Sequence, residues 1–391
     1  MEDDVFVESP SRFLNLRVEG FRRLAKVDIQ LRPLNVLIGA NGVGKTSLLD
    51  ALSLLASSAQ GSLNAALSEL SGLPAILTYD RSADLGLGLS LDWPGHSPLD
   101  YSLCVRQQGN EHFIRRETLS QPKDDGSPGS LHIDAGPGYV EYHDVDQGKL
   151  VRPYWQYDLG ETALSQVPRL YRTPEEFRRR LASSTFYHVL DVGPRSPVRL
   201  PQPMRPATLP GRNGEDLVSA LFSMQQADRD RFEAVEDAIR SAFPGFQRLD
   251  FPPVAAGTLA MTWREDRFSK PLYMHQLSEG TLRFLWLATL LQSPGLTALT
   301  LLDEPEVSLH PELLNLLAGL LREAARRTQI VVATHSDRLI RFLKPDEVIV
   351  MDTEEDGSAS LTWADSLDLE HWLEEYTLDE LWRSGHIGAR A

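Results

Sequence analysis

The sequence contains one cysteine, Cys104, among 391 residues. A disulfide within the chain and a cysteine-rich metal site are therefore excluded. No apolar run approaches the roughly 20 residues that span a membrane. The acidic start MEDDVFVESPSRF lacks the basic and apolar regions of a signal peptide. These features favour a cytoplasmic protein with no membrane partner.

Positive charge is also scarce, with 39 Lys and Arg residues against 55 Asp and Glu residues and a net charge of −16. Coating of nucleic acid by the whole surface needs clustered basic residues and is disfavoured. A local basic patch such as RTPEEFRRR stays open, although the solvated face of a helix explains the same run. The 42% hydrophobic content is that of an ordinary globular protein with a sizeable core.

Short apolar runs alternate with helical patterns along the chain. Two strands are expected in 13–32, and NVLI, ALTLLDE and QIVVATHS are expected as buried strands. Helices are expected in 160–185, 212–243, the segment that starts at Ser278, and PELLNLLAGLLREAARR. This order predicts an α/β fold with a mainly parallel core sheet, an added antiparallel β-layer and a helical lobe.

We expect a single bilobed unit over 1–391, with no internal repeat and no long coiled coil. Its expected parts are a phosphate-loop lobe with a β-hairpin (13–118), a flexible loop insert (119–150), a mainly helical lobe (151–250), a catalytic lobe (251–352) and a C-terminal extension (353–391).

The stretch GANGVGKT fits the phosphate-loop pattern G-x-x-x-x-G-K-[ST] between an apolar run and a helical segment. Glycine lets the backbone approach phosphate, and the start of the helix adds partial positive charge. Lys45 would contact the outer phosphates and Thr46 would ligate Mg²⁺. The predicted phosphate-binding set is Gly39, Asn41, Gly42, Gly44, Lys45, Thr46 and Ser47.

The run LTLLDEPEVSLHP ends an apolar strand with Asp303 and Glu304. Asp303 stands where phosphate-loop enzymes support Mg²⁺, and Glu304 would polarise the attacking water. An ordinary acidic strand end explains the pair equally well when it is read alone. Together with the phosphate loop, it predicts a hydrolytic site.

The run QLSEGTLRFLWLA places Ser278 and Gly280 at the start of a long apolar helix. A hydroxyl, a glycine and a helix N-terminus can form a second anion site. A simple capped helix is the alternative. His335, in ATHS, follows an apolar strand at an edge where open α/β sheets bind ligands.

Together these motifs resemble an ABC-type ATPase head over roughly residues 13–352. GANGVGKT matches Walker A, LSEGT resembles the ABC signature LSGGQ, LTLLDE matches Walker B, EVSLHP resembles the D-loop and ATHS the switch histidine. RVEGFRRL, DEPEVSLHP, ATHSDRLI and LDELWRSGHIGAR resemble the stand-alone AAA_21-type ATPases, relatives of the SMC, RecF-like and overcoming-lysogenization-defect ATPases. Glu279 and Thr281 depart from the usual Gly and Gln of the signature.

The resemblance implies ATP and Mg²⁺ as cofactors and a role for each matching residue. Lys45 holds phosphate, Asp303 and Thr46 support Mg²⁺, Glu304 is the catalytic base, and His335 senses the γ-phosphate. Across an ATP-dependent homodimer, the γ-phosphate bound by the opposite subunit would be contacted by Ser278 and Gly280, with Ser308 in the D-loop. Arg22 or Arg23 is the candidate for a basic nucleotide contact, and Gln166 for the Q-loop magnesium ligand.

The resemblance further implies an ATPase that lacks an effector domain of its own. We expect a switch that dimerises around two MgATP and controls a separately encoded nuclease or toxin, or a DNA contact, in DNA repair or antiphage defence. The alternatives are a nucleotide-binding scaffold with little turnover, and a nuclease hidden in 119–250, where no carboxylate–lysine constellation is visible.

Overall fold

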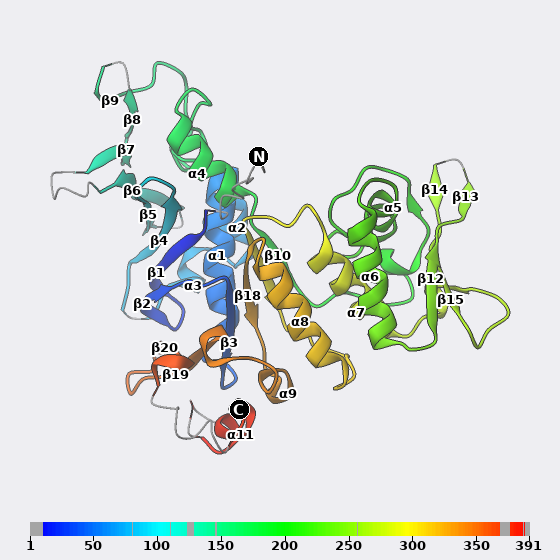
Figure 1. Cartoon of the computed structure of the whole chain (residues 1–391). Helices are drawn as coiled ribbons and strands as arrows, with labels where there is room; N and C mark the ends of the chain where they lie inside the picture. Colours follow the sequence, from blue (N-terminus) through cyan, green and yellow to red (C-terminus); the bar gives the residue numbers. More distant parts are fainter. Residues whose placement is uncertain are drawn as a thin grey trace, which may run out of the picture. The chain divides into compact units, whose positions relative to one another are not determined.

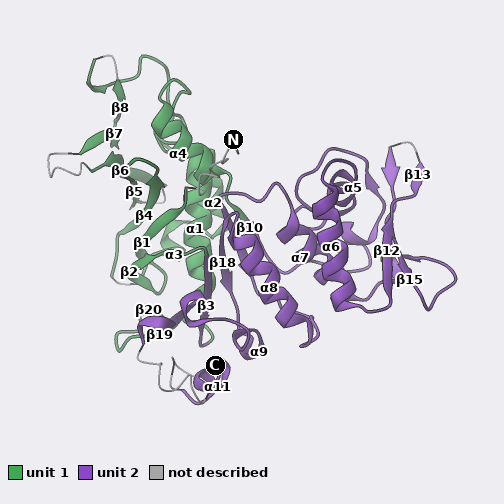
Figure 2. Ribbon diagram, viewed as in Figure 1, with its two compact units in different colours: residues 1–33, 41–185, 351–362 green, residues 34–40, 186–350, 363–391 purple. Residues whose placement is uncertain are grey.

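A computed structural model describes residues 11–79, 81–109, 111–122, 129–144, 147–255, 257–367, 376–385 and 387. The chain divides into two compact units, each made of segments that are distant in sequence (Figure 2). Unit 1 comprises residues 1–33, 41–185 and 351–362, and unit 2 comprises 34–40, 186–350 and 363–391. The expected division into consecutive segments is therefore replaced by two discontinuous units.

Unit 1 contains an eight-stranded sheet with the order β2-β1-β4-β5-β6-β7-β8-β9, in which every neighbouring pair is antiparallel (Figure 1). Alternate residues of its strands, such as Leu16 and Val18 of β1, are buried, as expected for a sheet with one covered face. The strands are β1 (Phe13–Phe21), β2 (Leu24–Gln30), β4 (Asp84–Trp93), β5 (His96–Gln108), β6 (Glu111–Gln121), β7 (Ser130–Gly136), β8 (Tyr139–Asp144) and β9 (Lys149–Val151).

The helices of unit 1 are α1 (Lys45–Gln60), α2 (Leu63–Glu69), α3 (Leu73–Ile76) and α4 (Arg172–Ala182). Helix α1 packs against α4 and β1. Its end at Gly61 (φ 74°) is a left-handed cap that glycine adopts without strain. Most of strand β20 (Ala359–Trp363) also belongs to this unit.

Unit 2 contains β17, β18 and β3 of a second sheet, with most of β10 and the first half of β19, in the order β10-β17-β18-β3-β19. Strands β17, β18 and β3 run parallel, with Asp303 opposite Ala333 and Ala333 opposite Leu37. All six residues of β3 are buried, as continuous apolar runs in parallel sheets usually are. The strands are β10 (Thr185–Tyr187), β17 (Leu299–Asp303), β18 (Gln329–Ala333), β3 (Leu34–Gly39) and β19 (Val348–Thr353).

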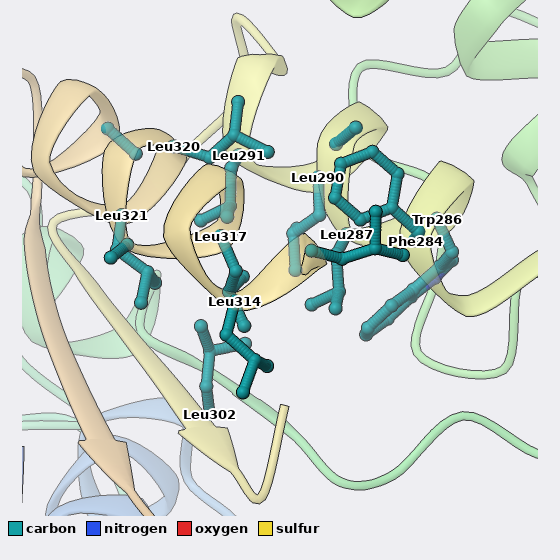
Figure 3. Close-up of a cluster of buried hydrophobic side chains, with 14 of the residues drawn as sticks. Phe284, Trp286, Leu287, Leu290, Leu291, Leu302, Leu314, Leu317, Leu320 and Leu321 are labelled. Carbon is teal, nitrogen blue, oxygen red and sulfur yellow. The ribbon is translucent and has the colours of Figure 1, made fainter. Parts of the chain in front are cut away.

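Helices α7 (Glu279–Gln292) and α8 (Leu313–Ala325) carry much of the core of unit 2. In α8, Leu314, Leu317 and Leu321 recur every three or four residues and form one apolar face. Figure 3 shows these leucines beside Leu302 of β17 and Leu290 of α7. This core fixes the segments that follow β17 and precede α7.

The remaining elements of unit 2 include two small three-stranded sheets and four helices. The sheets are β11-β14-β13 and β12-β15-β16. The strands are β11 (Gln202–Pro203), β12 (Phe246–Asp250), β13 (Pro253–Ala255), β14 (Thr258–Leu259), β15 (Thr262–Glu265) and β16 (Leu272–Tyr273), and the helices are α5 (Leu217–Ala227), α6 (Arg229–Ala242), α9 (Asp337–Ile340) and α11 (Leu378–Arg383). None of the helices among the described residues is both long and apolar enough to cross a membrane.

Two sequence-based expectations differ from the structure. The loop insert expected at 119–150 is wrong for most of its length, because β6 continues to Gln121 and strands β7 to β9 follow. Residues 123–128 and 145–146 of that segment lie outside the described residues. The helix expected over 160–185 is confined to α4, and turns precede it.

Candidate functional site

The phosphate loop joins the end of β3 to the start of α1. Gly39, Gly42 and Gly44 have φ values of 151°, 76° and 119°, which side-chain-bearing residues rarely adopt. Gly44 is the N-cap of α1, and no side chain accepts a hydrogen bond there from the first turn. The first backbone N–H groups of a helix without such a cap form a cradle suited to an anion.

The side chains of this loop divide into buried and exposed groups. Lys45 is 3% exposed, so its side chain is shielded from solvent, whereas Thr46 and Asn41 are exposed. A buried cation, left-handed glycines and an uncapped helix start together form a donor set that matches the phosphates of a nucleotide. The exposed hydroxyl of Thr46 is suited to Mg²⁺, which prefers oxygen ligands.

Arg22 lies beside the first turns of α1. It occupies the turn between β1 and β2 with φ 48°, a strained value for arginine. Its Nη1 donates to Asp50 Oδ2 at 2.5 Å and to Ser47 Oγ at 3.4 Å. The structure therefore brings Arg22 to helix α1 and pairs it there with Asp50, and its contact with a nucleotide stays a prediction. Arg23 is exposed.

The structure contradicts Gln166 as a magnesium ligand. Its side chain accepts from the Asp158 amide at 2.6 Å and donates to the Asp158 carbonyl at 2.8 Å, so it closes a local turn. Thr162 of the same turn donates to the Ser58 carbonyl, near the end of α1. Ser58 lies about 18 Å along the helix axis from Thr46 at the usual rise per residue. Gln166 is therefore at the wrong end of α1.

Unit 2 brings the acidic strand end and the switch histidine together. Glu304 follows β17 with φ 48°, and its amide donates to Ala333 O at 2.8 Å. His335 follows β18, and its Nε2 lies 3.6 Å from Glu304 Oε1. The Thr334 amide donates to Leu37 O of β3 at 3.1 Å. Asp303, Glu304, His335 and the end of β3 therefore share one edge of the sheet, where open α/β sheets bind ligands.

A second histidine lies at this edge and was missed in the sequence. His188 follows β10, and its Nδ1 lies 3.9 Å from Asp303 Oδ2, with 68% of its side chain exposed. Strand β10 has only three residues, too few to show an alternating pattern. The position of β10 in the sheet was the missing information.

The signature segment starts helix α7 as expected. Ser278 is the N-cap, and its Oγ accepts from the Thr281 amide at 3.1 Å. Ser278 and Glu279 are exposed. The space beside Gly280 is closed, because a Cβ there would lie 2.8 Å from Ser308 O. Ser308 has φ 63° and accepts from Arg283 Nη1 at 2.8 Å, so the start of α7 packs directly on the D-loop.

Glu306 is another residue that the motifs did not identify. Its Oε1 accepts from Thr334 Oγ1 at 2.5 Å and from the His335 amide at 3.3 Å. Burial raises the pKa of its carboxyl group. In the sequence it is the first residue of EVSLHP, and nothing there distinguishes it from other surface carboxylates. The contacts that identify it join two separate loops.

The family model named AAA_21, described as "AAA domain, putative AbiEii toxin, Type IV TA system", matches residues 34–341. The chain belongs to this family. Over 43 residues it is 58% identical to the DNA replication and repair protein RecF of Saccharophagus degradans, a match that covers 11% of this chain and 12% of that protein.

Solved SMC heads share the fold. A head bound to the C-winged helix domain of ScpA has a TM-score of 0.55 at 15% identity, over 90% of this chain and 97% of that one. A Pyrococcus furiosus head with an extended coiled coil, bound to the C-terminal domain of ScpA, has a TM-score of 0.55 at 12% identity, over 93% and 100% of the two chains. The predicted P-loop fold class and the resemblance to SMC- and RecF-like ATPases are confirmed.

Proposed function

We propose that this protein is an ATP-hydrolysing switch that dimerises around two MgATP and controls a partner. The observation that carries the proposal is the sheet edge of unit 2, where Glu304 and His335 lie 3.6 Å apart beside Asp303. At the same edge β3 ends in the phosphate loop. A carboxylate and an imidazole at the strand edge from which a phosphate loop starts are suited to nucleotide hydrolysis.

Each of the predicted site residues would have a defined task. Lys45 and the backbone N–H groups after Gly42 would hold the phosphates, and Thr46 and Asp303 would hold Mg²⁺. MgATP supplies a phosphoanhydride whose charge the metal neutralises. Glu304 would accept a proton from the attacking water, and His335 would donate a hydrogen bond to the negative charge that develops. His188, rather than Gln166, would supply a further polar contact beside Asp303.

The dimer proposal rests on groups that are exposed in one subunit. Ser278 is exposed at the start of α7 and Ser308 is exposed in the D-loop, with the half-buried Gly280 between them. Each subunit would present these groups to the phosphate bound by the other. The bound γ-phosphate would then join the two subunits, and its loss by hydrolysis would release them. Nucleotide hydrolysis would therefore act as a switch.

The relatives support a partner of two kinds. The family description names a toxin system, and the solved SMC head is bound to the C-winged helix domain of ScpA. The short RecF match is to a DNA replication and repair protein. We therefore propose a separately encoded effector such as a nuclease or toxin, or a DNA contact, in DNA repair or antiphage defence, with the protein acting in the cytoplasm.

The proposal is tested by phosphate release from ATP and from GTP with the purified chain. We expect ATP turnover in the wild type, a loss of about 100-fold or more in Glu304→Gln, and no turnover in Lys45→Ala. Glu312→Gln is the matched control, because this glutamate is exposed in the same loop with 88% of its side chain accessible. Equal turnover in wild type and Glu304→Gln would refute the assigned chemistry.

One observation favours a second function, that of a nucleotide-binding scaffold with little turnover. Glu279 replaces a signature glycine and is exposed in the first turn of α7. A carboxylate there opposes a phosphate approaching the helix start. Tight ATP binding with background turnover would favour the scaffold, which would assemble a nuclease or toxin complex.

The nuclease alternative in 119–250 gains no support. Among the described residues, no group of three or more His, Cys, Asp or Glu side chains is arranged to hold a metal ion.

A further inference from the structure

Glu306 joins the loop that follows β17 to the loop that follows β18. It lies in the D-loop segment, three residues after Asp303, and its carboxylate reaches the switch loop after β18. There its Oε1 accepts from the Thr334 hydroxyl at 2.5 Å and from the His335 amide at 3.3 Å. Its Oε2 is buried with no hydrogen-bond partner among the residues that the structure describes. Burying a carboxylate oxygen without a hydrogen-bond donor costs free energy. A role for Glu306 beyond packing is therefore expected.

The contacts continue from Glu306 into the switch loop. Thr334 is fully buried, and its Oγ1 accepts from the Ser336 amide at 3.0 Å. Ser336 in turn caps the start of α9, accepting from the Leu339 amide at 3.2 Å. His335 lies between these two anchored residues. Because its own amide is held by Glu306, the direction of its imidazole toward Glu304 depends on this carboxylate.

The contacts on the other side lead to the signature helix. Arg283 of α7 donates to Val307 O at 3.2 Å and to Ser308 Oγ at 2.8 Å, the two residues that follow Glu306. Gly280 of the same helix packs against Ser308 O. The start of α7, the D-loop and the switch loop are thus connected by direct contacts within unit 2. A shift of the D-loop backbone moves the carboxylate on which the switch loop rests.

We propose that Glu306 is a positioning residue that couples the D-loop to the switch histidine. It holds His335 in its hydrolytic orientation, and a partner subunit that contacts Ser278 or Ser308 reaches His335 through it. The inference rests on the proposed ATPase function and adds a regulatory connection to it. Glu306 touches neither nucleotide nor water in this account, so it acts only through His335.

A double-mutant cycle separates this role from general structural support. Glu306→Ala is expected to lower kcat at least tenfold with little change in KM, while Glu306→Gln, which keeps an acceptor for the Thr334 hydroxyl, retains most of the activity. In the His335→Ala background, Glu306→Ala is expected to have no further effect in single-turnover assays. Equal losses in both backgrounds would overturn the coupling and leave a structural role. No loss in either would also overturn it.

A second measurement does not depend on turnover. Hydrogen exchange of peptides that cover 329–340 reports the amides of the switch loop directly. We expect exchange there at least tenfold faster in Glu306→Ala, with peptides of α8 unchanged, and no change in the control Glu312→Ala. Unchanged exchange of the switch loop would refute the positioning role. A wild type that binds ATP without hydrolysing it would instead refute the proposed function, whatever the exchange result.

Discussion

Nε2 of His335 lies 3.6 Å from Oε1 of Glu304, and the two residues follow neighbouring parallel strands. The pairing of β17 with β18 brings the two residues together, and the hydrogen bond from the Glu304 amide to Ala333 O holds one strand end to the other. The strained φ of Glu304 turns its carboxylate at the point where the strand ends. This pair is the chemical centre of the proposed ATPase site.

His335→Ala removes the imidazole that would donate to the transferring phosphoryl group. We expect kcat to fall by roughly 10²–10³, as with loss of one donor to a developing charge. Nucleotide affinity should stay within a few-fold of wild type, because the phosphate loop is untouched. Phosphate release and nucleotide titration measure the two effects. His310→Ala is the control, since the side chain of that histidine is 69% exposed in the D-loop segment. An equal fall of kcat in His310→Ala would contradict a specific role for His335.

Lys45→Ala removes the buried ammonium group of the phosphate loop. Loss of a charge-assisted hydrogen bond should weaken nucleotide binding by about 10- to 100-fold. The stabilisation by MgATP seen in thermal unfolding should then disappear at nucleotide concentrations that stabilise the wild type. Lys26→Ala, on an exposed position of β2, should keep this stabilisation. Retention of tight binding in Lys45→Ala would contradict the assignment of the loop.

Gly280→Ala tests the packing of the signature helix on the D-loop. The new Cβ would lie 2.8 Å from Ser308 O, so the helix start or the D-loop must shift, at a cost of about 1–3 kcal/mol in stability. Gly319→Ala is a matched control in α8, where a Cβ meets nothing within 4 Å. That control should gain about 0.5–1 kcal/mol from helix propensity. Chemical unfolding of both variants gives the comparison, and equal stabilities would show that Gly280 is not tightly packed.

Glu117 makes the stability of unit 1 depend on pH. It is fully buried and accepts from the amides of Ala163 at 2.7 Å and Leu164 at 2.8 Å and from the Tyr101 hydroxyl at 3.0 Å. Burial raises its pKa from 4.5 to about 7. The folded state therefore binds the proton more tightly than the unfolded state, and stability falls as pH rises from 4.5 through 7.

Between pH 6 and 8, Glu117 should account for a loss of about 1 kcal/mol in the free energy of unfolding. Glu117→Gln cannot titrate, so it should lose this part of the slope, whereas Glu69→Gln, on an exposed position of α2, should keep it. Urea unfolding at several pH values measures the slope. An unchanged slope in Glu117→Gln would show that the carboxyl group does not titrate in this range.

The sequence predicted the parts of the site that local chemistry determines. The phosphate loop and the acidic pair at the end of β17 can be found because each motif lies in one continuous run. His335 could be placed because it directly follows an apolar strand. Each could be recognised from the residues beside it in the sequence.

The parts that failed depend on which elements the fold brings together. Gln166 was chosen by residue type alone, yet local bonds to Asp158 hold it near the far end of α1. His188 approaches Asp303 only because β10 lies next to β17 in the sheet. Glu306 is linked to Thr334 across 28 residues of sequence. Such long-range pairings carry no local pattern.

The solution mass of Glu304→Gln with and without MgATP is the decisive test of the proposed ATP-dependent dimer. This variant keeps the phosphate loop and the signature segment but lacks the carboxylate that would activate water. We expect a monomer mass without nucleotide or with ADP, a doubled mass with MgATP, and a transient or weaker doubling in the wild type. A mass that MgATP leaves unchanged, in a variant shown to bind ATP, would contradict the nucleotide-dependent dimer.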